Sequence, residues 1–290
     1  MPDAVRVTTD LLRDWPLPAP GDDKEARGRV LVVAGSRSTP GAALLAAESA
    51  LRAGAGKLKI ATAESCAASL AVAVPEAQVR WLREDDEGNI AVSEADLVVG
   101  VADGCDAVLL GPGFTDVDRA TDLLEGVLPR LETGVVIDAL ATAFVTEDPE
   151  RLSRLPATIV LTVNPTELAR CLGVEEDAVE SDLEGHTRTL ASRTGSVVVC
   201  GGTEKVIVHG DRAWLVEAGN PGLGVSGSGD TQSGMVAGVL ARGATPEQAA
   251  VWGAFLHAVA GDRLAERVGG VGYLAREIPG EVPGLLTELA

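Results

Sequence analysis

The chain of 290 residues has few aromatic side chains and no long apolar run. Aromatic residues make up only 3% of the chain, so aliphatic side chains must fill most of the core. No stretch of eighteen apolar residues occurs, and the chain does not start with a basic segment followed by an apolar one. We therefore expect a cytoplasmic protein with neither a transmembrane helix nor a signal peptide.

Basic side chains are also scarce. The 24 lysines and arginines face 43 acidic residues, which gives a formal net charge of −19. Such a surface repels nucleic acids and anionic membranes, so we expect neither as a partner. The composition fits a salt-adapted organism or an arginine-rich coding bias equally well. The chain has four lysines, which are Lys24, Lys57, Lys59 and Lys205.

Cysteine and histidine give no sign of a metal site. The four cysteines stand among apolar residues without CxxC spacing, so we expect buried free thiols in a reducing compartment. The three histidines are far apart in the sequence, and His257 in VWGAFLHAVAG is expected to be a packed helix residue. The cysteines are Cys66, Cys105, Cys171 and Cys200, and the other histidines are His186 and His209.

Short apolar runs alternate with helical patterns along the chain. The strand Arg29–Ser36, the helix Pro40–Gly56 and the strand Lys57–Thr62 form a strand–helix–strand unit that is typical of a parallel sheet. Later strands are predicted at 78–82, 106–110, 134–138, 158–162 and 196–200, with a hairpin at 205–216. Further helices are predicted at 64–72, 93–102, 116–131, 165–172, 183–193, from about 230, and at 246–268. This order predicts an α/β fold with a doubly wound, mostly parallel sheet and helices on both faces.

The sequence shows no internal repeat and no break in composition. Residues 1–27 are expected to form an N-terminal arm with one short helix near Thr9–Trp15, because PLPAPGDD is typical of a loop. Residues 28–290 are expected to form one domain, which ends in a short tail after the last helix.

Four glycine-containing or polar segments follow predicted strands. They are GSRSTPGA from Gly35, GPGF from Gly111, NPTE from Asn164, and SGSGD, which ends at Asp230. Each alone could be a simple turn, but α/β sheets bind ligands at the carboxyl ends of their strands. None matches GxGxxG, so a Rossmann dinucleotide site is not indicated.

The segment Asn220–Leu240 reads as a glycine-rich loop that leads into a helix of small residues. The backbone N–H groups of Gly227, Ser228 and Gly229 would be unpaired at the helix start, where they could bind an anion. Asp230 has two interpretations. It could cap the helix, as aspartate often does, or it could be a base that faces an acceptor hydroxyl.

Other polar residues at strand ends also have a structural and a functional interpretation. Asp138 could cap the next segment, or it could hold a metal or a ribose. Asn164 and Glu167 have the N-x-x-E spacing of a capping box. Gly202 and Thr203 could line a nucleotide or simply turn the chain.

Taken in order, these motifs resemble the ribokinase-like NAD(P)H-hydrate dehydratase family over nearly the whole chain from about Lys24. The matching segments are VLVVAGS, PGAALLAAESALRAGAG, LLGPGF, LTVNPTELARCLG, NPGLGVSGSGD and VGYLAREIP. The resemblance implies a ribokinase-like fold and repair of NADH or NADPH hydrated on the nicotinamide ring. It also implies ADP or ATP as phosphate donor, Mg²⁺, phosphorylation of the ring hydroxyl followed by elimination, and a homo-oligomer, expected to be a tetramer.

The resemblance also assigns site residues. Asp230 is the expected base, and Ala42, Gly113, Asn164 and Asp230 are the expected contacts of the hydrate. No residue is assigned to a metal. The expected nucleotide contacts are Gly202, Thr203, Lys205, Gly227, Ser228 and Gly229.

Three positions depart from the family pattern. Asn164 stands where the family usually has histidine, so a titratable group is lost. Gly201-Gly202 replaces the family's lysine-glycine, so a nucleotide contact is either lost or supplied elsewhere, with Lys205 as a candidate. Asp138 is followed by Ala139 and Leu140 rather than by a second aspartate.

Two other functions remain open at this point. A small-molecule kinase acting on a sugar or vitamin precursor would use the same base and anion loop. A non-catalytic nucleotide-binding protein would fit the missing lysine and histidine.

Overall fold

The computed structural model of the protein describes residues 4–202 and 204–290. Its centre is one ten-stranded sheet with the order β1-β10-β9-β8-β7-β6-β5-β2-β3-β4. Within the sheet, β9 is antiparallel to both neighbours, and all other paired strands are parallel. The strands are β1 (Val5–Arg6), β2 (Arg29–Val33), β3 (Lys57–Ala63), β4 (Ala77–Leu82), β5 (Ala107–Leu110), β6 (Gly134–Asp138), β7 (Ile159–Val163), β8 (Val197–Cys200), β9 (Lys205–His209) and β10 (Arg212–Val216).

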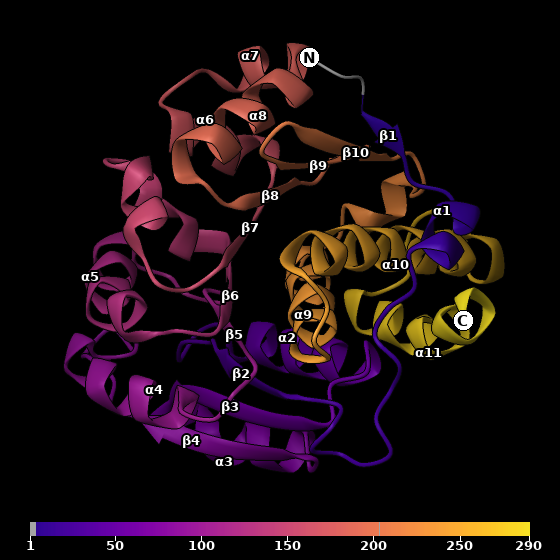
Figure 1. Ribbon diagram of the computed structural model, residues 1–290. Helices are drawn as coiled ribbons and strands as arrows, with labels where there is room; N and C mark the ends of the chain where they lie inside the picture. The colour runs from indigo at the N-terminus through magenta and orange to yellow at the C-terminus, as the bar shows by residue number, and fades with distance from the viewer. Residues whose placement is uncertain (1–3, 203) are drawn as a thin grey trace.

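Helices cover both faces of this sheet (Figure 1). On one face α3, α2, α9 and α10 lie in sequence beside one another, and α4, α5, α6 and α8 cover the other. The helices are α1 (Thr9–Asp14), α2 (Pro40–Arg52), α3 (Glu64–Ala73), α4 (Ala95–Ala102), α5 (Val117–Val127), α6 (Pro165–Leu172), α7 (Glu176–Ser181), α8 (Leu183–Thr194), α9 (Ser228–Ala241), α10 (Pro246–Arg267) and α11 (Ile278–Leu289). Short 3₁₀ helices lie at 92–94, 128–130, 139–145, 149–154, 221–223 and 275–277.

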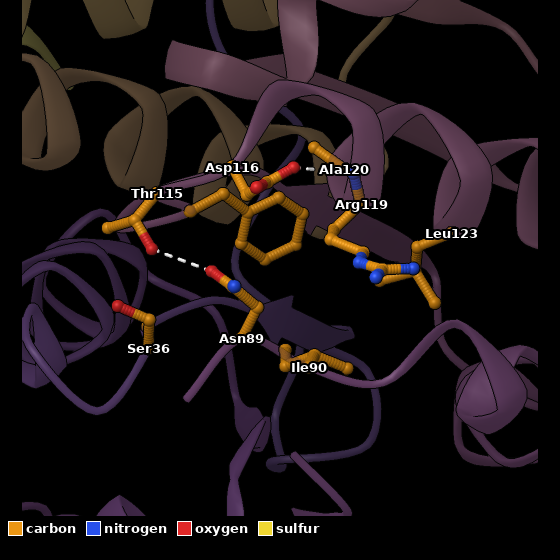
Figure 2. A pocket seen from close by; sticks show the side chains of 10 residues that line it. Ser36, Asn89, Ile90, Thr115, Asp116, Arg119, Ala120 and Leu123 are labelled. Atoms are coloured by element: carbon orange, nitrogen blue, oxygen red, sulfur yellow. Dashed lines mark hydrogen bonds between the residues drawn. The ribbon is translucent and has the colours of Figure 1, made fainter. Parts of the chain in front are cut away.

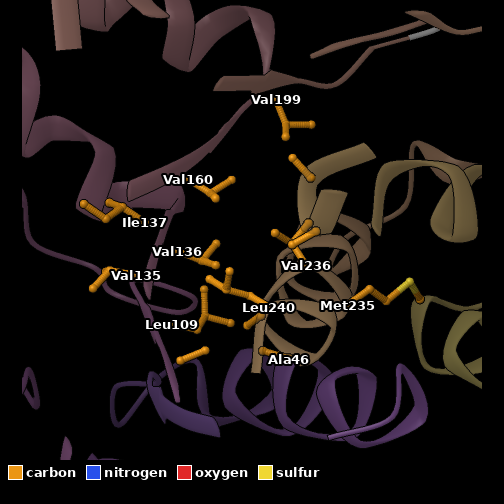
Figure 3. Close-up of a cluster of buried hydrophobic side chains, with 14 of the residues drawn as sticks. Ala46, Leu109, Val135, Val136, Ile137, Val160, Val199, Met235, Val236 and Leu240 are labelled. Carbon is orange, nitrogen blue, oxygen red and sulfur yellow. The ribbon is translucent and has the colours of Figure 1, made fainter. Parts of the chain in front are cut away.

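The central strands are buried on both faces, which explains their continuous runs of valine, leucine and isoleucine. Figure 3 shows aliphatic side chains of β5 to β8 packed against one side of α9. On α9 itself, Met235, Val236 and Leu240 are buried, as is Ala46 of α2. The core is therefore aliphatic, as the scarcity of aromatic residues predicts.

Glycines allow α9 to lie directly on α2. A Cβ on Gly234 would come 2.3 Å from the Ala46 carbonyl oxygen, and a Cβ on Gly238 would come 2.3 Å from that of Ala50. Both distances are far below any normal contact, so only glycine fits at this separation of the two helices. This contact sets how closely α9 lies beside α2 on that face of the sheet.

The N-terminal segment is tied to the sheet and to the C-terminal helix. Val5 and Arg6 pair with β10, and Leu12 is fully buried. The Trp15 ring stacks on Trp214 with 6.0 Å between the ring centroids. The backbone carbonyl of Trp15 accepts a hydrogen bond from the indole N–H of Trp252. The described part of this segment therefore packs on the remainder of the protein.

The predicted α/β class, with its mostly parallel sheet and helices on both faces, is confirmed. The prediction of a short tail was wrong, because α11 covers most of that segment. Two prolines and two glycines made a helix there look unfavourable. Ile278, Val282, Leu285 and Leu289 nevertheless share one buried helical face, whose packing outweighs these propensities. Strand β1, helix α7 and the 3₁₀ segments at 139–154 were not predicted.

Within residues 4–202 and 204–290, no helix combines the length and the apolar character needed to cross a lipid bilayer.

The contact between α2 and α9 generates a prediction about stability. Gly238→Ala forces a methyl group against the Ala50 carbonyl, so we expect a loss of about 1–3 kcal/mol in unfolding free energy. Gly100→Ala is the matched control, since a Cβ there meets nothing within 4 Å in a helix that packs elsewhere, and it should gain about 0.5–1 kcal/mol. Urea unfolding measures both, and equal effects of the two substitutions would contradict the proposed packing.

Candidate active site

A cavity of about 630 Å³ opens at the carboxyl ends of β6, β7 and β8, beside the amino end of α9. Its volume lies in the range of small-molecule binding sites. The ends of β6, β7 and β8 and the loop before α9 line it, so of the four segments singled out in the sequence NPTE and SGSGD contribute, whereas GSRSTPGA and GPGF do not. Of the expected site residues, it is lined by Asn164, Gly202, Lys205, Gly227, Ser228, Gly229 and Asp230.

The amino end of α9 provides free backbone donors. Gly227 caps the helix with a φ of 88°, and a Cβ there would lie 2.4 Å from Leu45 Cδ1, so the position requires glycine. In the described structure, the N–H groups of Gly229 and Asp230 have no backbone or side-chain acceptor. A Cβ on Gly229 would meet nothing within 4 Å, so a ligand can approach this backbone closely.

Two details differ from the expectation for this helix start. The helix begins at Ser228 rather than near Asp230. In addition, the Ser228 N–H already donates to the Val225 carbonyl over 3.1 Å, so it is not one of the unpaired amides. The hydroxyl of Ser228, rather than its amide, is the group that remains for a ligand.

The loop before α9 is held by a network around Asn220. Its side-chain oxygen accepts from the Gly222 N–H at 2.9 Å and from the Tyr273 hydroxyl at 3.1 Å. Its amide donates to Asp262, which also accepts from the Gly219 N–H. These bonds fix the NPG turn, and through it the start of α9.

Three carboxyl groups line the cavity. Asp138 ends β6 and is 6% exposed, with hydrogen bonds from Thr162 Oγ1 at 2.7 Å and Ser233 Oγ at 2.8 Å. Burial, then the neighbouring charges of Glu167 and Asp230, raise the pKa of Asp138 to about 8. Asp138 is therefore mainly protonated at neutral pH.

Asp230 is in a different protonation state. It is half-buried, and burial followed by the charge of Glu167 raises its pKa to about 6. At neutral pH it is mainly ionised, while its pKa is close enough to 7 for it to accept and release a proton. The two environments thus leave Asp138 as a neutral acid and Asp230 as an ionised carboxylate that can act as a base.

Asn164 and Glu167 form the predicted capping box at the start of α6. The Asn164 side chain accepts from the Glu167 N–H at 2.8 Å, and the Glu167 carboxylate accepts from the Asn164 N–H at 3.0 Å. Burial raises the pKa of Glu167, and the hydrogen bond from Asn164 partly offsets this. The Asn164 side chain stays exposed at the rim, where its amide can still meet a ligand.

Lys205 supplies the only ammonium group among the described residues that line this cavity. It is 5% exposed, and burial lowers its pKa to about 8. A Cβ built on Gly201 would lie 3.8 Å from Lys205 Nζ. The ammonium therefore reaches the space beside Gly201, where it has no carboxylate partner in the described structure.

Ala42 and Gly113 do not line this cavity. They pack on each other, since a Cβ on Gly113 would lie 2.8 Å from that of Ala42, and the Thr39 hydroxyl donates to the Gly113 carbonyl at 2.6 Å. Both lie at the carboxyl edge of β2 and β5, next to β6. Leu45, one helical turn after Ala42, connects them to Gly227. Thr203 lies outside the described residues.

A smaller hollow of about 10 Å³ lies near Gly113 (Figure 2). Ser36, Phe114 and Thr115 contribute to its wall, and the Thr115 hydroxyl donates to Asn89 at 2.7 Å. This volume is about that of one water molecule, so the hollow holds no organic ligand as it stands.

The sequence interpretation missed one member of the cavity lining. His257 was expected to be only a packed helix residue, and it is indeed buried in α10. Its Nε2 nevertheless lies 2.9 Å from Ser228 Oγ. Nothing in the local sequence indicates this contact, because it joins two helices 29 residues apart.

Among the described residues, no group of three or more histidine, cysteine, aspartate or glutamate side chains could hold a metal ion.

Comparison with known proteins identifies relatives over almost the whole chain. The model of a family described as NAD(P)H-hydrate dehydratase matches residues 30–283. The ADP-dependent (S)-NAD(P)H-hydrate dehydratase of Xanthomonas campestris pv. campestris is 44% identical over 284 residues, which cover 98% of this chain and 96% of that protein. The bifunctional NAD(P)H-hydrate repair enzyme of Moorella thermoacetica is 32% identical over 90% of this chain, which spans only 50% of its length.

Solved structures agree with these sequence relatives. The ADP/ATP-dependent NAD(P)H-hydrate dehydratase of Bacillus subtilis, co-crystallised with ATP/Mg²⁺, has a TM-score of 0.86 and 26% identity, and the match covers 99% of both chains. Hydroxyethylthiazole kinase from Pyrococcus horikoshii has a TM-score of 0.62 at 19% identity, which indicates a shared fold only.

The buried acid Asp138 generates a prediction about pH. Its pKa of about 8, against an ordinary value of 3.8, means that the folded state binds this proton more tightly than the unfolded state. Stability is therefore lost as pH rises from about 4 to about 8. Asparagine carries no such proton and can keep both hydrogen bonds. We expect the melting temperature of Asp138→Asn, relative to the unaltered chain, to rise steadily from pH 5 to pH 8.

The corresponding difference in the free energy of unfolding should reach on the order of a few kcal/mol at pH 8. Asp177→Asn on the exposed surface of α7, which also removes one negative charge, is the control measured over the same pH range. A difference for Asp138→Asn that does not change with pH would show that the acid is not protonated in the folded protein.

Proposed function

This chain belongs to the NAD(P)H-hydrate dehydratase family, and on that premise we propose that it uses ADP or ATP to dehydrate hydrated NADH and NADPH. The observation that carries the proposal is the position of Asp230. Its carboxylate stands beside the free N–H groups that begin α9, in a cavity large enough for a small-molecule ligand. A base and an anion site within one helical turn are what phosphoryl transfer to a hydroxyl requires.

In this proposal Asp230 accepts the proton of the ring hydroxyl as the oxygen attacks the terminal phosphorus of the nucleotide. The bond from that phosphorus to its bridging oxygen breaks, and the shortened nucleotide leaves. In the second step the carbon–oxygen bond of the phosphorylated ring breaks, phosphate departs with the electron pair, and a ring proton is lost to form the double bond. The raised pKa of Asp230, about 6, suits a group that must take up a proton near neutral pH.

The phosphate site is proposed to consist of the N–H groups of Gly227, Gly229 and Asp230, the Ser228 hydroxyl, and Lys205. The donor set fits a phosphate, because free backbone N–H groups and one ammonium group line the same cavity and a Cβ on Gly229 would find open space. Gly202, and Thr203 outside the described residues, are proposed to contact the remainder of the nucleotide. The protonated state of Asp138 lowers the negative charge that the phosphate would meet.

Mg²⁺ is proposed to enter with the nucleotide, because the described side chains form no complete metal site of their own. Such an ion neutralises charge on the phosphates during transfer. Of the cavity's carboxylates, Glu167 fits a contact with it, because one of its two oxygens carries the capping bond and the other has no partner in the described structure.

The hydrate is proposed to lie over Asp230 and Asn164 and to extend along the sheet edge toward Ala42 and Gly113. The strand order supports this path, since β7, β6, β5 and β2 are successive neighbours. Asn164 can donate and accept hydrogen bonds, but it cannot carry a proton between groups.

The direct test is incubation of the full chain with hydrated NADH and ADP or ATP, while the absorbance of reduced nicotinamide is followed. Recovery of that absorbance that depends on the nucleotide supports the proposal. Phosphate transfer to a sugar or vitamin precursor, with no recovery from the hydrate, would instead identify a kinase.

Removing the base should stop turnover and spare nucleotide binding. Asp230→Asn keeps the shape of the side chain but cannot accept a proton, so we expect kcat to fall about 10²–10⁴-fold. The dissociation constant for ATP, measured by calorimetry, should stay within a few-fold of the original. An enzyme that keeps most of its activity would exclude Asp230 as the base.

We expect Lys205 to make the nucleotide contact that the family usually makes through a lysine at the position of Gly201. Lys205→Met removes a charge-assisted hydrogen bond, so we expect ATP to bind about 10–100-fold more weakly. Adding Gly201→Lys should restore much of the affinity, because position 201 faces the same space and its nearest neighbours are 3.8 Å or more away. Lys59→Met, which removes a lysine bonded to the Val101 carbonyl, is the control.

Weak binding by both the single and the double variant would mean that Lys205 acts through the structure of β9 rather than through contact with the nucleotide.

A further inference from the structure

We propose that His257 is a positioning residue: it donates a hydrogen bond from Nε2 to Ser228 Oγ and so leaves the Ser228 hydroxyl hydrogen free for a phosphate. The inference rests on the proposed function, because it takes the anion at the start of α9 to be a phosphate of the nucleotide.

The contact between the two residues is direct and buried. His257 is 2% exposed and Ser228 is 6% exposed, and both line the cavity. The distance from His257 Nε2 to Ser228 Oγ is 2.9 Å. The Ser228 N–H is already bonded to the Val225 carbonyl, so of the two hydrogen-bond donors of Ser228 the hydroxyl is the one available to a ligand.

The imidazole is neutral. Burial, followed by the nearby charge of Lys205, holds the pKa of His257 well below its ordinary value. A neutral imidazole carries one N–H, on either Nε2 or Nδ1, and the other nitrogen can only accept. The position of this single hydrogen decides which partner of the pair donates.

The environment of Nδ1 favours the hydrogen on Nε2. Nδ1 is buried and has no hydrogen-bond partner in the described structure. A hydrogen on Nδ1 would be an orphaned buried donor, and Ser228 would then have to give its own hydrogen to Nε2. A hydrogen on Nε2 instead forms the observed bond and leaves only an unpaired acceptor, and buried groups of that kind are less rare in proteins.

The consequence for the cavity follows from the single hydrogen of a hydroxyl group. When His257 donates, Ser228 Oγ accepts, and its hydrogen can point at an anion beside the free N–H groups of Gly229 and Asp230. When Ser228 donates to His257, it presents lone pairs to the anion and repels it. His257 therefore turns Ser228 from a repulsive group into a donor for phosphate.

A double-mutant cycle tests this role. The full chain, His257→Leu, Ser228→Ala and the double variant are titrated with Mg²⁺–ATP by calorimetry. We expect His257→Leu to weaken binding about 3–10-fold and Ser228→Ala about 5–20-fold. The double variant should bind no more weakly than Ser228→Ala alone, because His257 acts through that hydroxyl.

A conservative variant separates positioning from packing. His257→Gln places an amide N–H near the position of Nε2, and it should recover most of the affinity that His257→Leu loses. Leu256→Ala, at a fully buried neighbour on α10 that does not line the cavity, should lower the melting temperature without weakening ATP binding. ¹⁵N NMR of the imidazole should find the hydrogen on Nε2, with and without nucleotide.

Three results would overturn the inference: full affinity in Ser228→Ala, additive losses in the double variant, or the hydrogen on Nδ1. In each case the unaltered chain still binds ATP, so the proposed function stands. An unaltered chain that binds neither ATP nor ADP would overturn both.

Discussion

The site depends on the close contact between α9 and α2. Because Gly234 and Gly238 carry no side chain, α9 lies directly against the backbone of α2, which fixes its position beside α2 on that face of the sheet. Gly227 continues the same contact at Leu45, where a larger residue would push the loop away. The free N–H groups and Asp230 are therefore placed by close packing of α9 together with the hydrogen bonds around Asn220 that hold the preceding loop. A rigid helix start of this kind needs no reorganisation when a charged ligand binds.

The negative charge in the cavity is lowered because one of its carboxyl groups is protonated. Three carboxyl groups and a single lysine would repel a polyphosphate if all were ionised. Burial keeps Asp138 neutral, with its pKa raised to about 8, and leaves Asp230 mainly ionised. Two hydroxyl groups hold Asp138 in place, so its neutral form is built into the end of β6. An overall acidic protein can thus keep one region that accepts an anion.

The sequence predicted the fold class, most strands and the gathering of loops at one sheet edge, because these follow from apolar periodicity and from glycines after strands. It predicted the capping box of Asn164 and Glu167, since that motif is local. It did not predict α11, where burial of one face outweighs proline and glycine, nor the pairing of His257 with Ser228, which only tertiary packing creates. The roles of the site residues, the homo-oligomer and the cytoplasmic location stay predictions.

The two ends of the described chain support one another. Arg13 in α1 donates to the Glu288 carbonyl in α11, and β1 closes the edge of the sheet on the same side. Because α1 and α11 share this contact, removing the last turn of α11 takes a hydrogen-bond partner from α1, so truncation at the C-terminus also weakens the docking of the N-terminal helix.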